Sequence, residues 1–431
     1  MVYLHVPFCR SFCTYCDFYS EIACRDRDAQ LFGSFTDAVC EEISRRRDEI
    51  EATRDLDTLY IGGGTPSVLP PICLRQILAS LMTGGVPPEP PASFRSGTTR
   101  HPSPLTEFTI EVNPEDIVEK GPGYVRELLD LGVNRVSMGV QSLEDGILRW
   151  MNRRHDAAHA RQAFRILREA GVGNISVDLI FGLPQLSETV LARTIEEIAA
   201  WRPEHVSAYQ LSIEEDSALG RLVREGRFTE APQEQCAAQY ALLCRMLQAA
   251  GYGHYEISNW ALPGFEAVHN SAYWSRHPYV GLGPAAHSFD GKTRSWNEYS
   301  LCSYSFALSN PHRFAEPPME GASPSTSVPG GDSVAATFSE SLADTPSRRL
   351  KAPSLRSYAN QASEQLTDIE EREEEIMLGL RTARGVPEGL IDAARAAAML
   401  SDGRLARLPD GHLRIPENHW FVSDDIVSDL L

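Results

Sequence analysis

Three cysteines near the start of the chain have the type and spacing needed to bind an iron–sulfur cluster. Cys9, Cys13 and Cys16 follow a CxxxCxxC pattern, so one short loop supplies three thiolates. A [4Fe-4S] cluster normally takes four thiolates, and Phe18 stands where a fourth would be expected, which leaves one iron open to another ligand. A closed zinc site is the alternative, but zinc sites favour paired CxxC motifs with a matching fourth ligand, and none follows here. We therefore predict a [4Fe-4S] cluster bound by these three cysteines.

The residues around the three cysteines resemble those of a known family. The cysteine loop follows Tyr-x-His-x-Pro-Phe and ends in Cys-Asp-Phe, and GGGTPS occupies positions 62–67. This combination resembles the radical S-adenosylmethionine (SAM) proteins. The later stretches HYEISNWALPG, HNSAYW and GLGPAAHSF resemble the HemW branch, which are heme chaperones related to oxygen-independent coproporphyrinogen III dehydrogenase. The likeness covers most of residues 1–300 and resumes near 366–431, and it implies SAM and heme as further cofactors.

Short apolar runs rich in β-branched residues alternate with helical segments. The runs lie at 3–6, 56–61, 108–112, 135–140, 175–180 and 206–211. Helical periodicity is clear in YVRELLDLG, in HARQAFRILREAG and over 188–201, and glycine ends the first two segments as a left-handed cap would. Strict alternation of strand and helix implies right-handed crossovers and a parallel sheet. We expect an α/β fold with an open, partial (β/α)6 barrel, which is also the core that the resemblance implies.

Two segments interrupt this order. Residues 83–106 contain six prolines, and residues 316–356 are rich in Ser, Pro and Gly, so we expect both to be disordered insertions. The predicted organisation is a core over 1–300 that includes the cysteine loop and the heme motif, followed by a C-terminal module over 366–431. That module opens with a capping-box pattern, Thr367-Asp-Ile-Glu370, and ends in LARLPDGHLRIP, a predicted hairpin. A small, winged-helix-like α+β module is the expected result.

Polar residues follow the predicted strands, where a parallel barrel places its ligands. A strand-capping hydrogen bond would explain any one of them alone. Together they favour a binding site, because an arginine can pair with the SAM carboxylate while acid and amide side chains accept from its amine and ribose hydroxyls. The glycine run suits close approach of the backbone to that amine. That run and the residue after it, Gly63, Gly64 and Thr65, are therefore predicted to line the SAM site. The resemblance implies SAM contacts for Tyr3, Glu111, Gln141, Arg153 and Asp178.

His269, in HNSAYW, is the predicted heme residue, because the resemblance implies that this motif supplies an axial ligand. An imidazole can ligate heme iron, and Tyr273 and Trp274 offer flat apolar area to a porphyrin. His287 and His254 are the competing ligands, and a hydrogen-bonded structural role for His269 is the alternative.

The composition excludes several classes of function. A formal charge of −19 without a Lys/Arg stripe argues against nucleic-acid binding. No stretch of 18 apolar residues is present to span a bilayer, and Met1 lies too close to the cysteine loop for a signal peptide, so we expect a cytoplasmic protein. The expected partners are heme, a heme-acceptor protein and a one-electron reductant.

Three functions fit these observations. The first is a heme chaperone that keeps the radical SAM core. The second is an oxygen-independent coproporphyrinogen III dehydrogenase. Phe18 opposes this function, because the dehydrogenase carries a cysteine at that position. The short stretch before Tyr3 also opposes it, because the dehydrogenase has a long N-terminal arm there. The third is a cluster-bearing scaffold without turnover, in which Gln141, Arg153 and Asp178 would have no purpose. We expect the first, and dehydrogenase activity is not expected.

Overall fold

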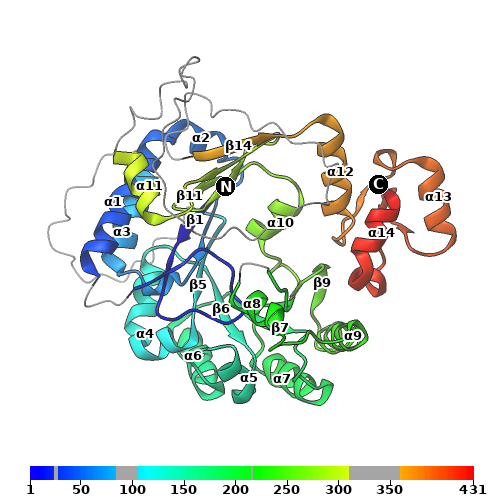
Figure 1. Cartoon of the computed structure of the whole chain (residues 1–431), viewed down its shortest axis with the longest axis horizontal. Coiled ribbons are helices and arrows are strands. Elements are labelled where there is room, and N and C mark those ends of the chain that lie inside the picture. The colour runs from blue at the N-terminus through cyan, green and yellow to red at the C-terminus, as the bar shows by residue number, and fades with distance from the viewer. Residues whose placement is uncertain (24–27, 84–104, 215–216, 310–359) are drawn as a thin grey trace, which may run out of the picture.

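A computed structural model describes residues 1–23, 28–83, 105–214, 217–309 and 360–431, and its centre is a mostly parallel sheet (Figure 1). Six neighbouring strands of this sheet are parallel to one another. They are β1 (Val2–Val6), β4 (Thr58–Gly63), β5 (Glu107–Val112), β6 (Arg135–Gln141), β7 (Ile175–Phe181) and β8 (His205–Gln210). All six predicted strands are therefore confirmed, with bounds that shift by one or two residues.

Three short strands extend the sheet to the order β11-β1-β4-β5-β6-β7-β8-β10-β9. At one edge, β11 (Val280–Leu282) runs parallel to β1. At the other edge, β10 (Asn259–Ala261) is antiparallel to β8 and to β9 (Gly253–Glu256). Among the described residues no ladder joins β9 to β11, so the sheet is an open, partial barrel with helices between its parallel strands.

The connecting helices begin and end where the sequence carries recognisable signals. The helices are α1 (Ala29–Arg45), α2 (Arg47–Ala52), α3 (Pro71–Thr83), α4 (Pro114–Asp130), α5 (Asp145–Trp150), α6 (Ala157–Ala170), α7 (Glu188–Trp201), α8 (Ala218–Arg224) and α9 (Gln233–Ala249). Helix α6 ends at Gly171, whose φ of 98° is the predicted left-handed cap. Helix α7 ends in the same way at Arg202, with φ 54°, without the help of a glycine. No described helix combines the length and the apolar composition needed to cross a bilayer.

The two faces of the sheet differ in polarity because strand side chains alternate. In β5, Phe108, Ile110 and Val112 belong to the buried apolar core that the helices cover. The residues that alternate with them, Glu107, Thr109 and Glu111, point to the opposite, concave face. The same alternation holds in β4, β6 and β7, so the inside of the partial barrel is lined by polar side chains. A cavity for charged ligands is thus built into the strand pattern.

Helix α10 (Val268–Trp274) packs against the sheet at the end where the parallel strands begin. The carboxylate of Glu107 accepts hydrogen bonds from the backbone N–H groups of Val268 (2.8 Å) and His269 (3.1 Å). These are first-turn N–H groups without a helical partner, so a buried carboxylate caps the helix. The cap fixes α10 on the strand that also carries Glu111.

The second half of the chain adds two small sheets. Strands β12 (His287–Phe289), β13 (Thr293–Asn297) and β14 (Asn360–Gln365) form one antiparallel sheet. Strands β15 (Val386–Pro387), β17 (His412–Arg414) and β16 (Ala406–Arg407) form the other, and β16 and β17 are the predicted hairpin. The helices of this half are α11 (Leu301–Ser309), α12 (Asp368–Gly379), α13 (Ala393–Ser401) and α14 (Ser423–Leu430).

The capping box of Thr367 and Glu370 at the start of α12 is confirmed, with both of its hydrogen bonds present. Most of the first predicted insertion, and all of 316–356, lie outside the described residues. The division into a core over 1–300 and a module over 366–431 stays a prediction. Strand β14 lies before residue 366 and pairs with β13, so it belongs to the sheet of β12 and β13.

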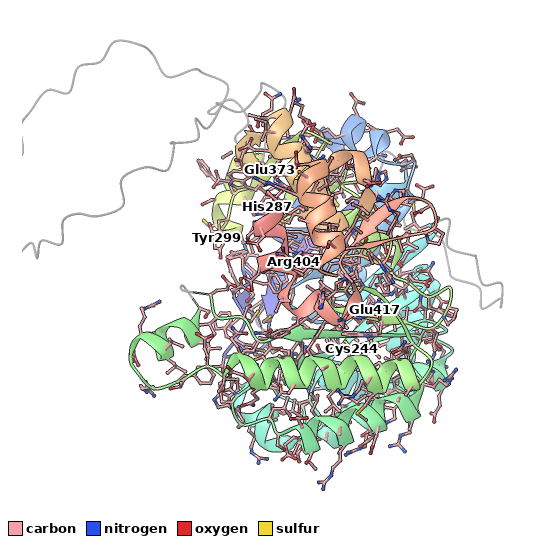
Figure 2. All side chains as sticks on the ribbon, turned by 90° about the vertical axis from the view of Figure 1, so that its right-hand side faces the viewer. Cys244, His287, Tyr299, Glu373, Arg404 and Glu417 are labelled. Atoms are coloured by element: carbon pink, nitrogen blue, oxygen red, sulfur yellow. The ribbon has the colours of Figure 1, made fainter. Side chains whose placement is uncertain are left out.

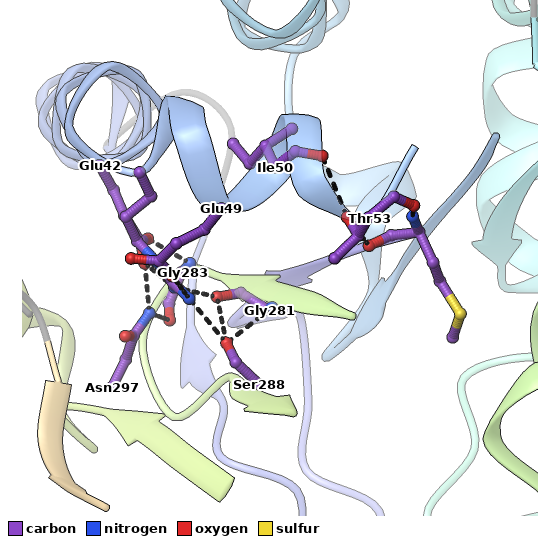
Figure 3. A network of polar contacts seen from close by, with 10 residues as sticks. Glu42, Glu49, Ile50, Thr53, Gly281, Gly283, Ser288 and Asn297 are labelled. Atoms are coloured by element: carbon purple, nitrogen blue, oxygen red, sulfur yellow. Dashed lines mark hydrogen bonds and ion pairs between the residues drawn. The ribbon is translucent and has the colours of Figure 1, made fainter. Parts of the chain in front are cut away.

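A buried polar network ties α1 to the segment that carries β11 to β13 (Figure 3). Its centre is Glu42, which is fully buried and paired with Arg46 at 2.9 Å. Glu42 Oε1 also accepts from Asn297 Nδ2 (2.8 Å), and Oε2 accepts from the Gly283 N–H (2.9 Å) and from Tyr304 Oη (2.5 Å). Arg46 in turn donates to the Gly281 carbonyl and to Ser288 Oγ. The network therefore fixes β11 beside β1.

Candidate functional site

A cavity of about 810 Å³ opens at the carboxyl ends of the parallel strands, next to the cysteine loop. Loops that leave parallel strands converge at this end of the sheet, which explains why residues far apart in the sequence meet there. The predicted residues that line the cavity are Cys9, Cys13, Cys16, Gly63, Gly64, Thr65, Glu111, Gln141, Arg153 and Asp178.

The cysteine loop leaves β1 and is held in place at several points. Strand β2 (Phe8–Cys9) pairs with β3 (Glu21–Ile22), so the two ends of the loop are joined. Thr14 N–H donates to the Met151 carbonyl (3.1 Å), and Asn152 Nδ2 donates to the Phe12 carbonyl (2.7 Å). The loop is thus fastened to the segment after α5 that also carries Arg153.

The three thiols are free and partly exposed, and they face the same cavity. Cys9 Sγ lies 3.5 Å from Thr65 Oγ1, and Cys13 Sγ accepts a hydrogen bond from Arg153 Nη1 at 3.5 Å. Burial raises the pKa of Cys16 to about 12, so this thiol keeps its proton until a metal displaces it. Among the described residues no three His, Cys, Asp or Glu side chains are arranged to hold a single metal ion. Three thiols on one cavity wall fit the predicted [4Fe-4S] cluster.

Arg153 lies next to the cysteines and keeps one donor unused. Its Nη2 donates to Asn113 Oδ1 (2.6 Å) and to the Gly139 carbonyl (2.9 Å), which fixes the plane of the guanidinium. Its Nε is buried without a hydrogen-bond partner. An unpartnered buried donor is costly, and a carboxylate bound in the cavity would remove that cost. The site therefore fits the carboxylate of an amino-acid ligand such as SAM.

Two buried carboxylates face the same cavity. Glu111 accepts from Tyr60 Oη (2.7 Å) and from the Gly63 N–H (3.2 Å), and burial raises its pKa to about 7. Asp178 accepts from Ser137 Oγ (2.9 Å), and burial raises its pKa as well. A cationic ligand would favour the ionised form of both groups. The acceptors therefore suit the ammonium and sulfonium charges of SAM.

Two strand ends at the cavity wall have unusual backbone geometry. Gln141 has a φ of 63°, which is unusual outside glycine, and it follows an irregularity in the pairing of β6 with β7. Gly63 has a φ of 110°, and a Cβ there would lie 2.7 Å from the His5 ring. A Cβ at Gly64 would lie 2.8 Å from the Phe8 carbonyl oxygen and 3.1 Å from Cys9 Sγ. Gly63 is therefore required by its packing against His5 of β1, and Gly64 by its packing against the start of the cysteine loop.

Tyr3, the remaining predicted SAM residue, is not among the residues that line the cavity. Its hydroxyl lies 3.1 Å from His5 Nδ1, and its ring is 6.2 Å from that of Tyr60. Conversely, the cavity is lined by Tyr60 and Asn113, which the sequence analysis did not select. Asn113 directly follows β5, so the rule that selected Glu111 at the end of the same strand could also have found it.

The structure does not bring His269 to the cavity. The His269 side chain is 1% exposed, with Nδ1 bonded to Thr58 Oγ1 (2.9 Å) and Nε2 to Tyr273 Oη (3.0 Å). Thr58 begins β4, whereas Gly63, which lines the cavity, ends it. Burial lowers the pKa of His269 to about 3, so the ring is neutral. Iron ligation by His269 stays a prediction, and it requires at least one of these two hydrogen bonds to break.

The two competing histidines have opposite environments. His254 is buried, with its ring 4.1 Å from that of Trp260 and 4.3 Å from that of Trp420. His287 lies exposed on β12, with its ring parallel to that of Trp296. Only the second of these side chains is exposed.

Comparison with known proteins agrees with this geometry. Residues 3–198 match the model of the Radical SAM superfamily. The chain is 34% identical over 296 residues to a protein of Bacillus subtilis named Heme chaperone HemW, which covers 68% of this chain and 72% of the relative. It is 34% identical over 300 residues to the Mycobacterium tuberculosis H37Rv protein of the same name, covering 69% and 71%.

Among solved structures, coproporphyrinogen III oxidase (HemN) from Escherichia coli aligns with a TM-score of 0.70 and 17% identity. The alignment covers 99% of this chain and 89% of that enzyme, which establishes the shared fold. The match to the radical SAM model, together with identity of one third to the HemW proteins over more than two thirds of both chains, shows that this chain belongs to the HemW family of radical SAM proteins.

Proposed function

We propose that this chain is a heme chaperone that binds a [4Fe-4S] cluster and SAM in the cavity and passes heme to an acceptor protein. The observation that carries the proposal is the meeting of three cysteines with Arg153, Glu111 and Asp178 around one cavity. The relatives named as heme chaperones, which align over more than two thirds of their length, support the choice of heme as cargo.

The cavity residues have distinct roles in this proposal. Cys9, Cys13 and Cys16 hold the cluster, and the exposed Phe18 offers no fourth thiolate, so one iron remains for SAM. Arg153 pairs with the SAM carboxylate through its unused Nε, while Glu111 accepts from the amine or the ribose. When bound and reduced, the cluster supplies the electron that cleaves SAM.

Phe18 also affects the choice between heme transfer and the second candidate function, that of a coproporphyrinogen III dehydrogenase. The structural match to HemN is at 17% identity and concerns the fold alone, so it does not favour that reaction over heme transfer. Phe18 lies at the cavity wall with two thirds of its surface exposed, where it has no group to exchange protons or bind metal. We therefore keep the dehydrogenase only as an outcome of the test.

The test uses one anaerobic preparation reconstituted with iron and sulfide. Hemin is titrated into it, and transfer is followed by adding apomyoglobin and measuring the change in the heme absorbance. In parallel, coproporphyrinogen III is incubated with the protein, SAM and dithionite. Saturable heme uptake followed by transfer, without consumption of the porphyrinogen, supports the proposal. Sustained protoporphyrinogen formation, or no heme uptake at all, rejects it.

A Cys13→Ser variant and an Arg153→Ala variant separate the two cofactors. Cys13→Ser should lose the broad visible absorbance of the cluster, and iron and sulfide at the wild-type level would reject the assignment of the cluster ligands. Arg153→Ala should keep the cluster and weaken SAM binding in calorimetric titrations, because the ligand carboxylate loses its charged partner. A scaffold without SAM would show no SAM heat in any of the proteins.

A further inference from the structure

The cysteine sulfurs of this chain differ in the groups that approach them. Cys244, on α9 (Figure 2), has its Sγ 4.0 Å from His254 Nδ1, which is a weak contact for a thiol. Cys9 and Cys13 of the cysteine loop are approached more closely, each to 3.5 Å, by a hydroxyl or guanidinium group of another side chain. The polar groups at these two predicted cluster ligands belong to one connected set.

Asn113 joins the polar neighbours of the two sulfurs. Cys13 Sγ accepts from Arg153 Nη1, and Cys9 Sγ lies beside Thr65 Oγ1. Asn113 lies between these neighbours, because its Oδ1 accepts from Arg153 Nη2 (2.6 Å) and its Nδ2 donates to Thr65 Oγ1 (3.1 Å). A chain of hydrogen bonds therefore runs from one cysteine to the other through three side chains.

The direction of this chain follows from its first member. A guanidinium can only donate, so the amide oxygen of Asn113 must face Arg153 and the amide NH2 must face Thr65. The Thr65 oxygen accepts on that side, and its single hydroxyl proton is left for Cys9 Sγ. A metal-bound thiolate carries no proton and can only accept. Both sulfurs therefore accept a hydrogen bond, one directly from the guanidinium and one through the relay.

Asn113 occupies a position where its side chain would ordinarily have another use. It is the N-cap residue of α4, and asparagine is favoured there because its side-chain oxygen accepts from a backbone N–H of the first turn. The Asn113 side chain makes no such hydrogen bond and lines the cavity instead. Its replacement should therefore leave the start of α4 intact while removing the contacts with Arg153 and Thr65.

We propose that Asn113 is a positioning residue that links Arg153 to the cluster ligand Cys9 and raises the reduction potential of the cluster. This inference rests on the proposed function. Hydrogen bonds to the sulfurs are one of the factors that set the reduction potential of an iron–sulfur cluster. They raise it, because a one-electron reduction adds negative charge, and N–H and O–H donors stabilise that charge. Asn113 orients the donor at each end of the chain, so both sulfurs depend on one amide.

The same amide connects the cluster to the SAM site. Arg153 Nη2 is held by Asn113 Oδ1 and by the Gly139 carbonyl, so the direction of the unused Nε depends partly on Asn113. Loss of the Asn113 amide should therefore change two measured properties, the reduction potential and the SAM affinity. Loss of the Thr65 hydroxyl should change mainly the first, because the contacts of Arg153 remain.

The experiment uses the full chain, reconstituted anaerobically with iron and sulfide and titrated with dithionite in the presence of redox mediators. The reduced cluster is measured by electron paramagnetic resonance at each ambient potential. Asn113→Ala should keep the iron and sulfide content of the wild type and lower the ratio of reduced to oxidised cluster at a fixed potential by about threefold or more. It should also weaken SAM binding in calorimetric titrations.

Thr65→Val and Thr65→Ser isolate the contact at Cys9. Valine keeps the shape of threonine without the hydroxyl, so the ratio of reduced to oxidised cluster should fall about tenfold, which is a shift of about 59 mV for a one-electron couple. Serine keeps the hydroxyl, so Thr65→Ser should keep the potential of the wild type. Equal potentials for the two variants would overturn the proposal, also in the case that Asn113→Ala binds no cluster.

Asn152→Gly is the matched control. Asn152 also holds the cysteine loop, through a hydrogen bond from its Nδ2 to the Phe12 carbonyl (2.7 Å), but this bond leads to a carbonyl and not to a sulfur. Its φ of 57° suits glycine, so the change loosens the loop without straining it and should leave the potential unchanged. A shift as large as that of Asn113→Ala, or a wild-type potential in Asn113→Ala, overturns the proposal. A wild-type protein that binds no cluster or no SAM rejects the proposed function instead.

Discussion

Replacing Glu42 with glutamine tests how strongly the network in Figure 3 holds the segment that carries β11 to β13. Both carboxylate oxygens of Glu42 accept two hydrogen bonds, from Arg46 and Asn297 at Oε1 and from Gly283 and Tyr304 at Oε2. A glutamine can place its oxygen on one side only. Its amide nitrogen then faces two donors on the other side, at a site with no access to water.

The expected loss can be estimated from burial and charge. Glu42 and Arg46 are both nearly inaccessible, with side chains 1% and 3% exposed, so the substitution leaves a buried guanidinium with one carboxylate, Glu49, which is itself 45% exposed. Breaking a buried pair by changing one partner costs about 3–5 kcal/mol. The matched control is Glu197→Gln, which breaks the pair with Arg161 at a surface where the side chains are 34% and 44% exposed. That change should cost about 1 kcal/mol or less.

The assay is urea unfolding of the apo protein, followed by tryptophan fluorescence and by far-ultraviolet circular dichroism. The two Glu→Gln variants change the same atoms, so they should share one denaturant slope and differ only in midpoint. A double variant, Glu42→Leu with Arg46→Met, should lose less stability than the sum of the single changes, because it leaves neither charge unpaired. Equal midpoints for Glu42→Gln and Glu197→Gln would refute the reasoning.

Three further outcomes follow from the cavity. Burial raises the pKa of Glu111 from 4.5 to about 7, so the folded apo protein binds a proton that the unfolded chain releases, and its stability falls as pH rises through that window. Glutamine does not titrate, so the unfolding free energy of Glu111→Gln minus that of the wild type should rise by up to ~3 kcal/mol from the low-pH end of this window to the high-pH end. Urea titrations at each pH measure this difference. Gly64→Ala should prevent cluster reconstitution, because its Cβ would lie 3.1 Å from Cys9 Sγ, while Gly33→Ala, with open space around its Cβ, should leave iron content unchanged. Gln141→Gly should stabilise the apo protein by up to ~1 kcal/mol by relieving its positive φ, yet weaken SAM binding in calorimetry because an amide is lost from the cavity wall.

Much of the fold was predictable because its signals are local. Six apolar runs with β-branched residues became six parallel strands, and the glycine after 157–170 became a left-handed cap. The flanking strands β9, β10 and β11 were not predicted, since three or four residues carry too little periodicity to stand out. Helix α7 ends at Arg202 in a conformation that its sequence does not favour, so that end depends on tertiary packing.

The candidate site was predictable to the extent that strand order determines it. Gln141 ends β6, and Glu111 and Asp178 lie on the concave side of its two neighbours, β5 and β7, so the strand order brings all three to one cavity. The sequence could not show on which side of the sheet α10 packs, because a capping bond from Glu107, 161 residues away, decides it. Nor could it distinguish His269 from His287, since ring access depends on the neighbours of β4 and β12 and not on the motifs that carry the two histidines.

The place of β1 in the sheet has a consequence for the order of folding during synthesis. Strand β1 lies between β11 and β4, so its two neighbours are made about 50 and almost 280 residues after it. The strands from β4 to β8, which supply much of the cavity wall beside the cysteine loop, are all made before residue 211. A nascent chain can therefore form most of the cavity wall while one side of β1 is still without its last neighbour. The edge strand β11 joins last, so most of the cavity wall can form before the sheet is complete.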